Sequence, residues 1–164
     1  MQNQLSFWEQ DTFLNHIDVL IVGGGIVGLN AALQLRSKAP KLKITLVERS
    51  PLSAGASTKN AGFACFGSMT ELLDDLAQNG ADQMLTLVEK RWKGLMRLRK
   101  RVGDEALAFK DCGGYEVFGE TDKANYEASM DAMEEINTLL RPIIGDKEVF
   151  RAMDGEMQKL GLRG

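Results

Sequence analysis

The stretch DVLIVGGGIVGLNAALQL, residues 18–35, decides the fold of this 164-residue chain. Its first five residues form a short apolar run rich in β-branched side chains, which is typical of a buried strand. Glycines follow, and residues 26–37 then have the apolar spacing of a helix that ends before Pro40. A second strand-like run, KITLVE, covers residues 43–48. The pattern predicts two parallel strands joined by a helix, a unit of about 30 residues, and therefore an α/β fold.

The glycines between the first strand and the helix fit the pattern G-x-G-x-x-G of a dinucleotide-binding turn. Gly23 permits the tight turn, Gly25 lets a pyrophosphate approach the backbone, and Gly28 allows the helix to pack closely on the strand. The first helical residues, Ile26 and Val27, then direct their backbone N–H groups at the phosphates. A tight turn alone would also use glycines, but the strand before it and the helix after it favour a binding site.

An acidic residue ends the second predicted strand. Glu48 stands twenty residues after Gly28, where a carboxylate accepts hydrogen bonds from the ribose hydroxyls of an adenosine and repels a 2′-phosphate. An ordinary charge at a strand end is the alternative. Arg49 is most simply a solvated side chain, although it could cover an adenine or meet a phosphate. The acid and the glycine turn together predict a Rossmann-like dinucleotide site.

Residues 51–67 form a long loop of small and turn-forming residues, and loops of this length are usually functional. Within it GASTKNAG, residues 55–62, resembles a motif of the D-amino-acid oxidase superfamily of FAD-dependent oxidoreductases, which includes glycine and sarcosine oxidases. The glycine turn and LVERS, residues 46–50, are similar to the front of the same family. In that family the loop lies along the pyrophosphate, ribityl chain and flavin. The resemblance therefore assigns cofactor contacts to Ser57, Thr58, Lys59, Asn60, Ala61 and Gly62.

The resemblance implies that the complete enzyme binds FAD and oxidises a small-molecule amine or amino acid, with hydride passing from the carbon that carries nitrogen to the flavin. Family chains are longer, so we expect this chain to be the N-terminal part, with the catalytic residues in an absent C-terminal half. We expect the chain to self-associate or to pair with that half. An NAD-dependent dehydrogenase is the first alternative, and the loop at residues 55–62 argues against it. A non-catalytic nucleotide-binding fragment is the second.

Three segments are expected along the chain. Residues 1–80 are the N-terminal part of an incomplete FAD-binding domain, residues 81–105 are an amphipathic helix of that domain, and residues 106–164 begin a mixed-sheet substrate domain. A capping box at Ser68 predicts a helix that ends at about Gln78. The helix of the middle segment carries an apolar stripe of Leu85, Val88, Trp92, Leu95 and Val102.

Strands and one helix are predicted in the last segment. Residues 106–118 suggest one or two strands, and their end, GGYEVF, resembles the strand that begins the family's substrate domain. A helix capped by Thr121 or Asp122 is expected to end at Arg141-Pro142. A strand over residues 148–153 and a short helix before Gly161 complete the expectation.

Composition narrows the function classes. The chain is 44% hydrophobic and 26% charged, with a formal net charge of −3, which is typical of a globular protein. The longest uncharged stretch near the front, residues 19–29, is shorter than the roughly 20 residues of a membrane span, and no secretory signal precedes it. Basic residues of the amphipathic helix are interpreted as a solvated face and not as a nucleic-acid site. Cys65 and Cys112 have neither disulfide nor metal-site spacing, which predicts a reducing cytoplasm, no metal site, and a packed, unreactive Cys65.

Overall fold

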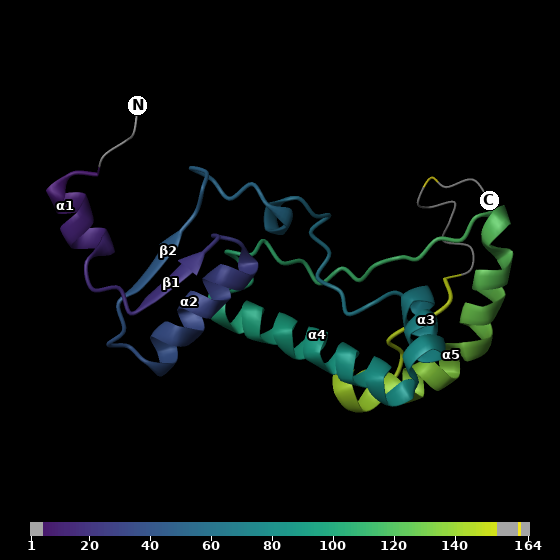
Figure 1. The fold of residues 1–164 in the computed structure, drawn as a ribbon. Coiled ribbons are helices and arrows are strands. Elements are labelled where there is room, and N and C mark those ends of the chain that lie inside the picture. Colours follow the sequence, from purple (N-terminus) through teal and green to yellow (C-terminus); the bar gives the residue numbers. More distant parts are fainter. Residues whose placement is uncertain (1–4, 154–160, 162–164) are drawn as a thin grey trace. The chain divides into compact units, whose positions relative to one another are not determined.

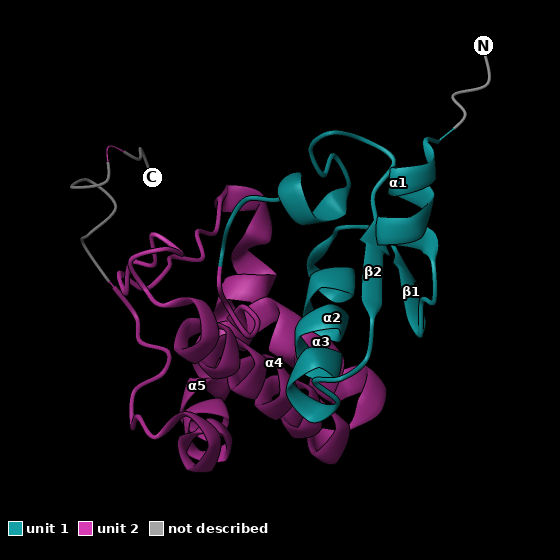
Figure 2. Cartoon of the chain, turned by 90° about the vertical axis from the view of Figure 1, so that its left-hand side faces the viewer, with its two compact units in different colours: residues 1–63 teal, residues 64–164 magenta. Residues whose placement is uncertain are grey.

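The computed structural model of the chain describes residues 5–153 and residue 161. It forms two compact units, residues 1–63 and residues 64–164 (Figure 2). The predicted domain boundaries at residues 80 and 105 stay a prediction. The elements, in chain order, are α1 (Phe7–Glu9), η1 (Gln10–Leu14), β1 (Val19–Val22), α2 (Ile26–Lys38), β2 (Ile44–Val47), η2 (Ala56–Thr58), α3 (Met69–Asn79), α4 (Ala81–Val102), η3 (Glu120–Asp122) and α5 (Lys123–Ile144) (Figure 1).

Unit 1 contains the two strands and the connecting helix that were predicted from the sequence, β1, α2 and β2. β1 and β2 pair in parallel, with Val19 opposite Ile44 and Val22 opposite Val47. The ladder continues beyond the strands, because the N–H of Gly23 donates to the carbonyl of Val47 at 2.8 Å. The α/β class and the parallel pair predicted from the sequence are thus confirmed.

The two-stranded sheet has an open face. Side chains alternate along β1, so Val19 and Ile21 are half-buried while Leu20 is 54% and Val22 80% exposed. The exposed residues of α2 include Ile26, which is 53% exposed. A parallel sheet is normally covered on both faces, so this apolar surface is unusual for the fold class.

A short helical stretch that the sequence did not predict precedes β1. Ser6 and Glu9 form a capping box at the start of α1, and the π-helical η1 continues it. The stretch is tied to the sheet by a hydrogen bond from the Thr45 hydroxyl to the carbonyl of Phe13 at 3.3 Å. Its aromatic rings remain exposed, since Phe7 and Trp8 pack mainly against each other with ring centroids 5.3 Å apart.

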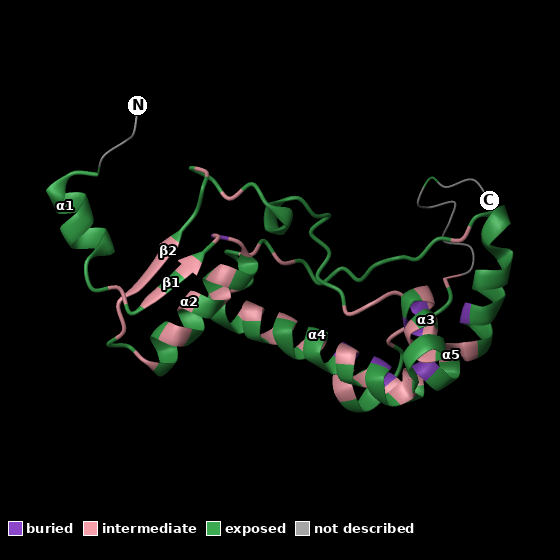
Figure 3. Cartoon of the chain, viewed as in Figure 1, coloured by how far each residue is buried: buried purple, intermediate pink, exposed green. Residues whose placement is uncertain are grey.

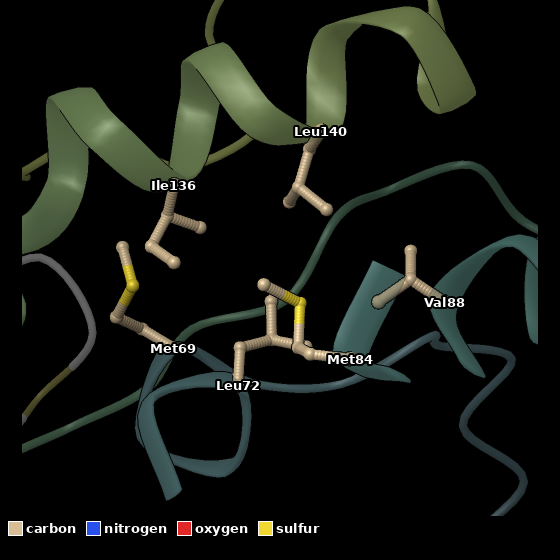
Figure 4. Close-up of a cluster of buried hydrophobic side chains, with 6 residues drawn as sticks. All are labelled: Met69, Leu72, Met84, Val88, Ile136 and Leu140. Carbon is tan, nitrogen blue, oxygen red and sulfur yellow. The ribbon is translucent and has the colours of Figure 1, made fainter. Parts of the chain in front are cut away.

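Unit 2 holds a hydrophobic core formed by three helices. α3 begins with the predicted capping box of Ser68 and Glu71 and ends at Gly80, whose φ of +79° also starts α4. The buried side chains come from the facing sides of α3, α4 and α5 (Figures 3 and 4). Burial of each contributes about 1.5–3 kcal/mol relative to exposure. They are Met69, Leu72, Met84, Val88, Ile136 and Leu140.

The strands predicted over residues 106–118 are absent from the structure. Residues 103–109 instead form a turn closed by hydrogen bonds such as that from the N–H of Phe109 to the carbonyl of Asp104 at 2.9 Å. Gly113 then interrupts the extended backbone with a φ of +67°. A strand exists only beside a hydrogen-bonded partner, and within the described part of the chain β1 and β2 form the one sheet.

Three further predictions need correction, and a fourth falls on residues that the structure does not describe. Residues 148–153 are not a strand, because both backbone groups of Phe150 bond to the amide side chain of Asn137 at 2.8 and 2.9 Å. Pro142 lies inside α5, which ends only at Gly145, where the backbone turns left-handed. Cys65 is exposed rather than packed, since it lies within the long loop of residues 51–67 and not in a hydrophobic core. The helix predicted before Gly161 lies outside the described residues.

Candidate functional site

The glycine turn between β1 and α2 is built by close backbone packing. Gly23 has a φ of +103°, which favours glycine, and a Cβ added there would meet nothing within 4 Å. At Gly28 a Cβ would lie 2.1 Å from the carbonyl oxygen of Gly23 and 3.3 Å from a methyl group of Ile21. The first helical turn therefore needs a glycine at position 28 in order to approach the strand.

Gly24, the variable position of the glycine pattern, is the most enclosed residue of the turn. It is buried, and its N–H donates to Glu48 Oε2 at 2.8 Å while its carbonyl accepts from the Ser53 hydroxyl at 3.0 Å. A Cβ there would approach the Ser53 oxygen to 3.0 Å. The pattern gave no signal for this role, because the partners of Gly24 lie more than twenty residues away in the sequence.

The N-terminus of α2 is closed by a residue of the long loop. Gly25 is the cap residue and has no side chain, so the cap is supplied by Ser57, whose hydroxyl oxygen accepts from the N–H of Ile26 at 2.9 Å. A Cβ at Gly25 would lie 3.0 Å from the same oxygen. The first backbone donor of this 13-residue helix is thus bonded to the loop that the sequence singled out.

Loop residues 53–62 hold their own shape through short-range hydrogen bonds. The Thr58 hydroxyl is 2.9 Å from the carbonyl oxygen of Ser53 and 3.1 Å from that of Gly55. The Asn60 amide donates to the carbonyl of Ser57 at 2.9 Å and accepts from the N–H of Gly62 at 2.8 Å. These bonds fix the 3₁₀ turn η2, which presents Ser57 to α2.

The Glu48 carboxylate is an anion held beside the turn. The hydrogen bond from the Gly24 N–H, with smaller contributions from the backbone of Ser50 and Arg49, keeps the pKa of Glu48 below its ordinary value. Glu48 is exposed and directly follows β2, so hydroxyl donors can reach its carboxylate. Its chemistry suits the recognition of a diol.

The structure places all of the predicted site residues on unit 1 and joins several of them by hydrogen bonds. The glycine turn, Glu48 and Ser57 are joined by hydrogen bonds. The other residues assigned to the cofactor are exposed on the same unit: Val27, Arg49, Thr58, Lys59, Asn60, Ala61 and Gly62.

A comparison with protein-family models identifies the class of the chain. The model described as DAO, FAD dependent oxidoreductase, matches residues 18–160. The chain belongs to this DAO family of FAD-dependent oxidoreductases. Searches of curated proteins and of solved structures give no match.

Features of the glycine turn fit the cofactor of the DAO family. Gly23 leaves open space above the backbone, the N-terminus of α2 is exposed at Ile26 and Val27, and a carboxylate stands at the end of the adjacent strand. A diphosphate suits the helix N-terminus, and a ribose suits the carboxylate. Across residues 5–153, no group of three His, Cys, Asp or Glu side chains could hold a metal ion, and no helix is long and apolar enough to cross a membrane.

In unit 2, a second carboxylate with several hydrogen bonds is that of Glu116. It lies in the segment that was predicted from the sequence to form a strand. Glu116 Oε2 accepts from the N–H of Met69 at 2.9 Å and from that of Thr70 at 3.4 Å, and Oε1 accepts from the Thr70 hydroxyl. A carboxylate at a helix N-terminus stabilises the helix by charge and hydrogen bonding. Glu116 therefore anchors the extended segment to α3, a structural role that sequence reasoning missed.

Proposed function

We propose that unit 1 binds the ADP portion of FAD and that the chain supplies the cofactor-binding part of an oxidoreductase that acts on an amine or amino acid. One observation carries the proposal. Glu48 and Ser57 accept hydrogen bonds of 2.8 and 2.9 Å from two N–H groups of the glycine turn, those of Gly24 and Ile26. The Glu48 carboxylate, which suits a ribose, and the N–H groups at the start of α2, which suit a diphosphate, are thereby held at the same short stretch of backbone.

Each group has a distinct task in this proposal. Glu48 accepts hydrogen bonds from the ribose hydroxyls, and the N–H groups of Ile26 and Val27 donate to phosphate oxygens. The exposed side chains of Arg49 and Lys59 add positive charge near the diphosphate. When bound, the flavin accepts hydride from the carbon that carries the amine nitrogen, and the protein's part is to bind and orient it.

An NAD-binding domain would use the same turn and the same acid, because NAD and FAD share the ADP portion. Two observations favour FAD. The family model that matches the chain is one of FAD-dependent enzymes. The loop of residues 53–62 is folded against the helix N-terminus through Ser57, which supports the cofactor role that its resemblance suggests.

Cofactor binding is tested by titrating the purified chain with FAD and following flavin fluorescence, with ADP and NAD⁺ as competitors. We expect saturable FAD binding that ADP displaces and NAD⁺ displaces less well. Tighter binding of NAD⁺ than of FAD would favour the dehydrogenase alternative. Amine-dependent oxygen uptake by the flavin-loaded chain tests the substrate class separately.

A further inference from the structure

The loop that carries the proposed cofactor contacts is held again where it ends. Residues 51–67 begin on unit 1 and end on unit 2, whose first residue is Ala64. On unit 2 the Nη1 of Arg91 donates a hydrogen bond of 2.9 Å to the carbonyl oxygen of Phe66. Arg91 belongs to α4, 25 positions further along the chain. The last residues of the loop are therefore bound to a helix of unit 2.

Aromatic packing supports the same loop residue. The ring of Phe66 lies edge to face with that of Trp92 in α4, with centroids 6.0 Å apart, and with that of Phe150, with centroids 6.2 Å apart. Phe150 is itself fixed, because both of its backbone groups bond to the side chain of Asn137 in α5. Phe66 also packs against the hydrophobic core of unit 2. At Phe66 the loop thus becomes part of the helical unit.

The backbone turns directly beside the Arg91 guanidinium. Gly67 has a φ of +147°, and a Cβ added there would lie 3.1 Å from a methyl carbon of Leu72 and 3.6 Å from Arg91 Nη1. A guanidinium is planar and presents its donors in a fixed geometry, whereas the ammonium of a lysine is a point charge on a flexible stem. The position of the Phe66 carbonyl is therefore better defined by an arginine than by a lysine.

The held residue lies close in sequence to the cofactor loop. Gly62 is the last residue assigned to the cofactor, and Phe63, Ala64 and Cys65, all exposed, connect it to Phe66. An extended chain spans at most about 3.6 Å per residue, so Gly62 stays within about 14 Å of Phe66. Holding Phe66 restricts the loop before it, and a loop with fewer conformations loses less entropy when it orders around a ligand.

We infer that Arg91 is a positioning residue for the FAD site, which acts through Phe66 by restricting the conformations of loop residues 58–62. The inference rests on the proposed function. There, the ADP portion of FAD relies mainly on Glu48 and the start of α2, which leaves the loop to contact the flavin half. Arg91 is therefore expected to contribute to the affinity for FAD and not to the affinity for ADP.

The test compares the affinities of the purified chain for FAD and for ADP, both measured by calorimetric titration. Arg91→Met removes the donor, and we expect FAD to bind about fivefold more weakly, the factor that corresponds to one hydrogen bond, with ADP binding unchanged. Arg91→Lys keeps a charged donor and should restore part of the FAD affinity. Arg97→Met is the matched control, because it makes the same substitution at another exposed arginine of α4, and should change neither affinity.

The two affinities separate a positioning role from a structural one. A loss of stability alone would lower both affinities by one factor or leave both unchanged. Either result in a folded Arg91→Met variant would overturn the positioning role and leave the proposed function intact, and Arg91→Lys provides the same comparison if Arg91→Met does not fold. A folded wild-type chain that binds neither ADP nor FAD would overturn the proposed function, and the positioning role with it.

Discussion

Glu48 Oε2 accepts a hydrogen bond of 2.8 Å from the N–H of Gly24, which ties the end of β2 to the middle of the glycine turn. The carboxylate therefore has two tasks in the proposed site, to hold the turn and to hold a ribose. Both tasks need an acceptor with negative charge, and the lowered pKa of Glu48 keeps it ionised near neutral pH.

Glu48→Gln is the first test of this arrangement. The substitution keeps an acceptor oxygen but removes the charge, so we expect FAD and ADP to bind about tenfold more weakly through loss of charge-assisted hydrogen bonds. Fluorescence titration measures the change. Arg49→Gln, at the next position, is the control and should have the smaller effect; equal affinities of Glu48→Gln and wild type would remove Glu48 from the site.

Local signals account for what the sequence predicted correctly. The glycine run, the apolar runs beside it and the capping box at Ser68 each lie within a few residues of the element they specify. The contacts that shape the site do not. Ile26 bonds to a residue 31 positions away, and Glu116 reaches Met69 across 47 positions. No periodicity encodes such a pair, since it depends on where the fold places each loop.

The strands predicted over residues 106–118 failed for a related reason. Apolar alternation indicates that a segment can be extended, but a strand also needs a neighbouring backbone. In the structure the polar groups of this region have other partners: the N–H of Phe109 closes a turn, and the carboxylate of Glu116 accepts from the N–H of Met69 at the start of α3. Propensity alone could not reveal that competition.

Gly28→Ala is expected to destabilise unit 1 by about 3 kcal/mol. Its Cβ would lie 2.1 Å from the Gly23 carbonyl oxygen, so the helix must move away from the strand. Gly25→Ala is the matched control, because its Cβ would meet only the Ser57 hydroxyl at 3.0 Å. Urea unfolding followed by circular dichroism measures both. Equal stability of the two variants would contradict the close helix–strand contact.

Gly94→Ala should have the opposite effect. Gly94 lies inside α4, and an added Cβ would meet nothing within 4 Å. Alanine loses less backbone entropy than glycine when a helix forms, which predicts a gain of about 0.5–1 kcal/mol in the free energy of unfolding. A decrease in thermal stability on calorimetry would show that position 94 requires glycine for another reason.

The ion pair of Arg99 and Asp104 predicts a pH dependence. Two hydrogen bonds of 2.8 and 2.7 Å join the groups, and the Arg99 guanidinium holds the pKa of Asp104 below its ordinary value of 3.8. Because the folded-state pKa is the lower one, the stabilisation is present above about pH 4 and is lost as the pH falls through the folded-state pKa.

Thermal unfolding of Asp104→Asn and wild type over a pH series measures this contribution. The difference in melting temperature should be full at pH 6 and should shrink below about pH 4 as Asp104 becomes protonated in the wild type. Asp131→Asn, at another exposed carboxylate, is measured in parallel as the control. A difference that stays constant down to pH 2 would mean that the ionised pair does not stabilise the fold.

The open face of the sheet predicts self-association. Leu20 and Val22 are 54% and 80% exposed on adjacent positions of one sheet face, and within the described residues each of the two strands has one edge without a hydrogen-bonded neighbour. Exposed apolar surface and free strand edges favour pairing with another chain. Light scattering on the isolated chain should therefore show dimers or larger species whose fraction rises with concentration.

Replacing both Leu20 and Val22 by threonine retains strand propensity while removing apolar surface, and should shift the chain toward monomer. Leu52→Thr changes a loop residue that is 82% exposed, about as much as Val22, and should leave the association unchanged. A wild-type chain that remains monomeric at all concentrations would show that unit 1 tolerates its open sheet without a partner.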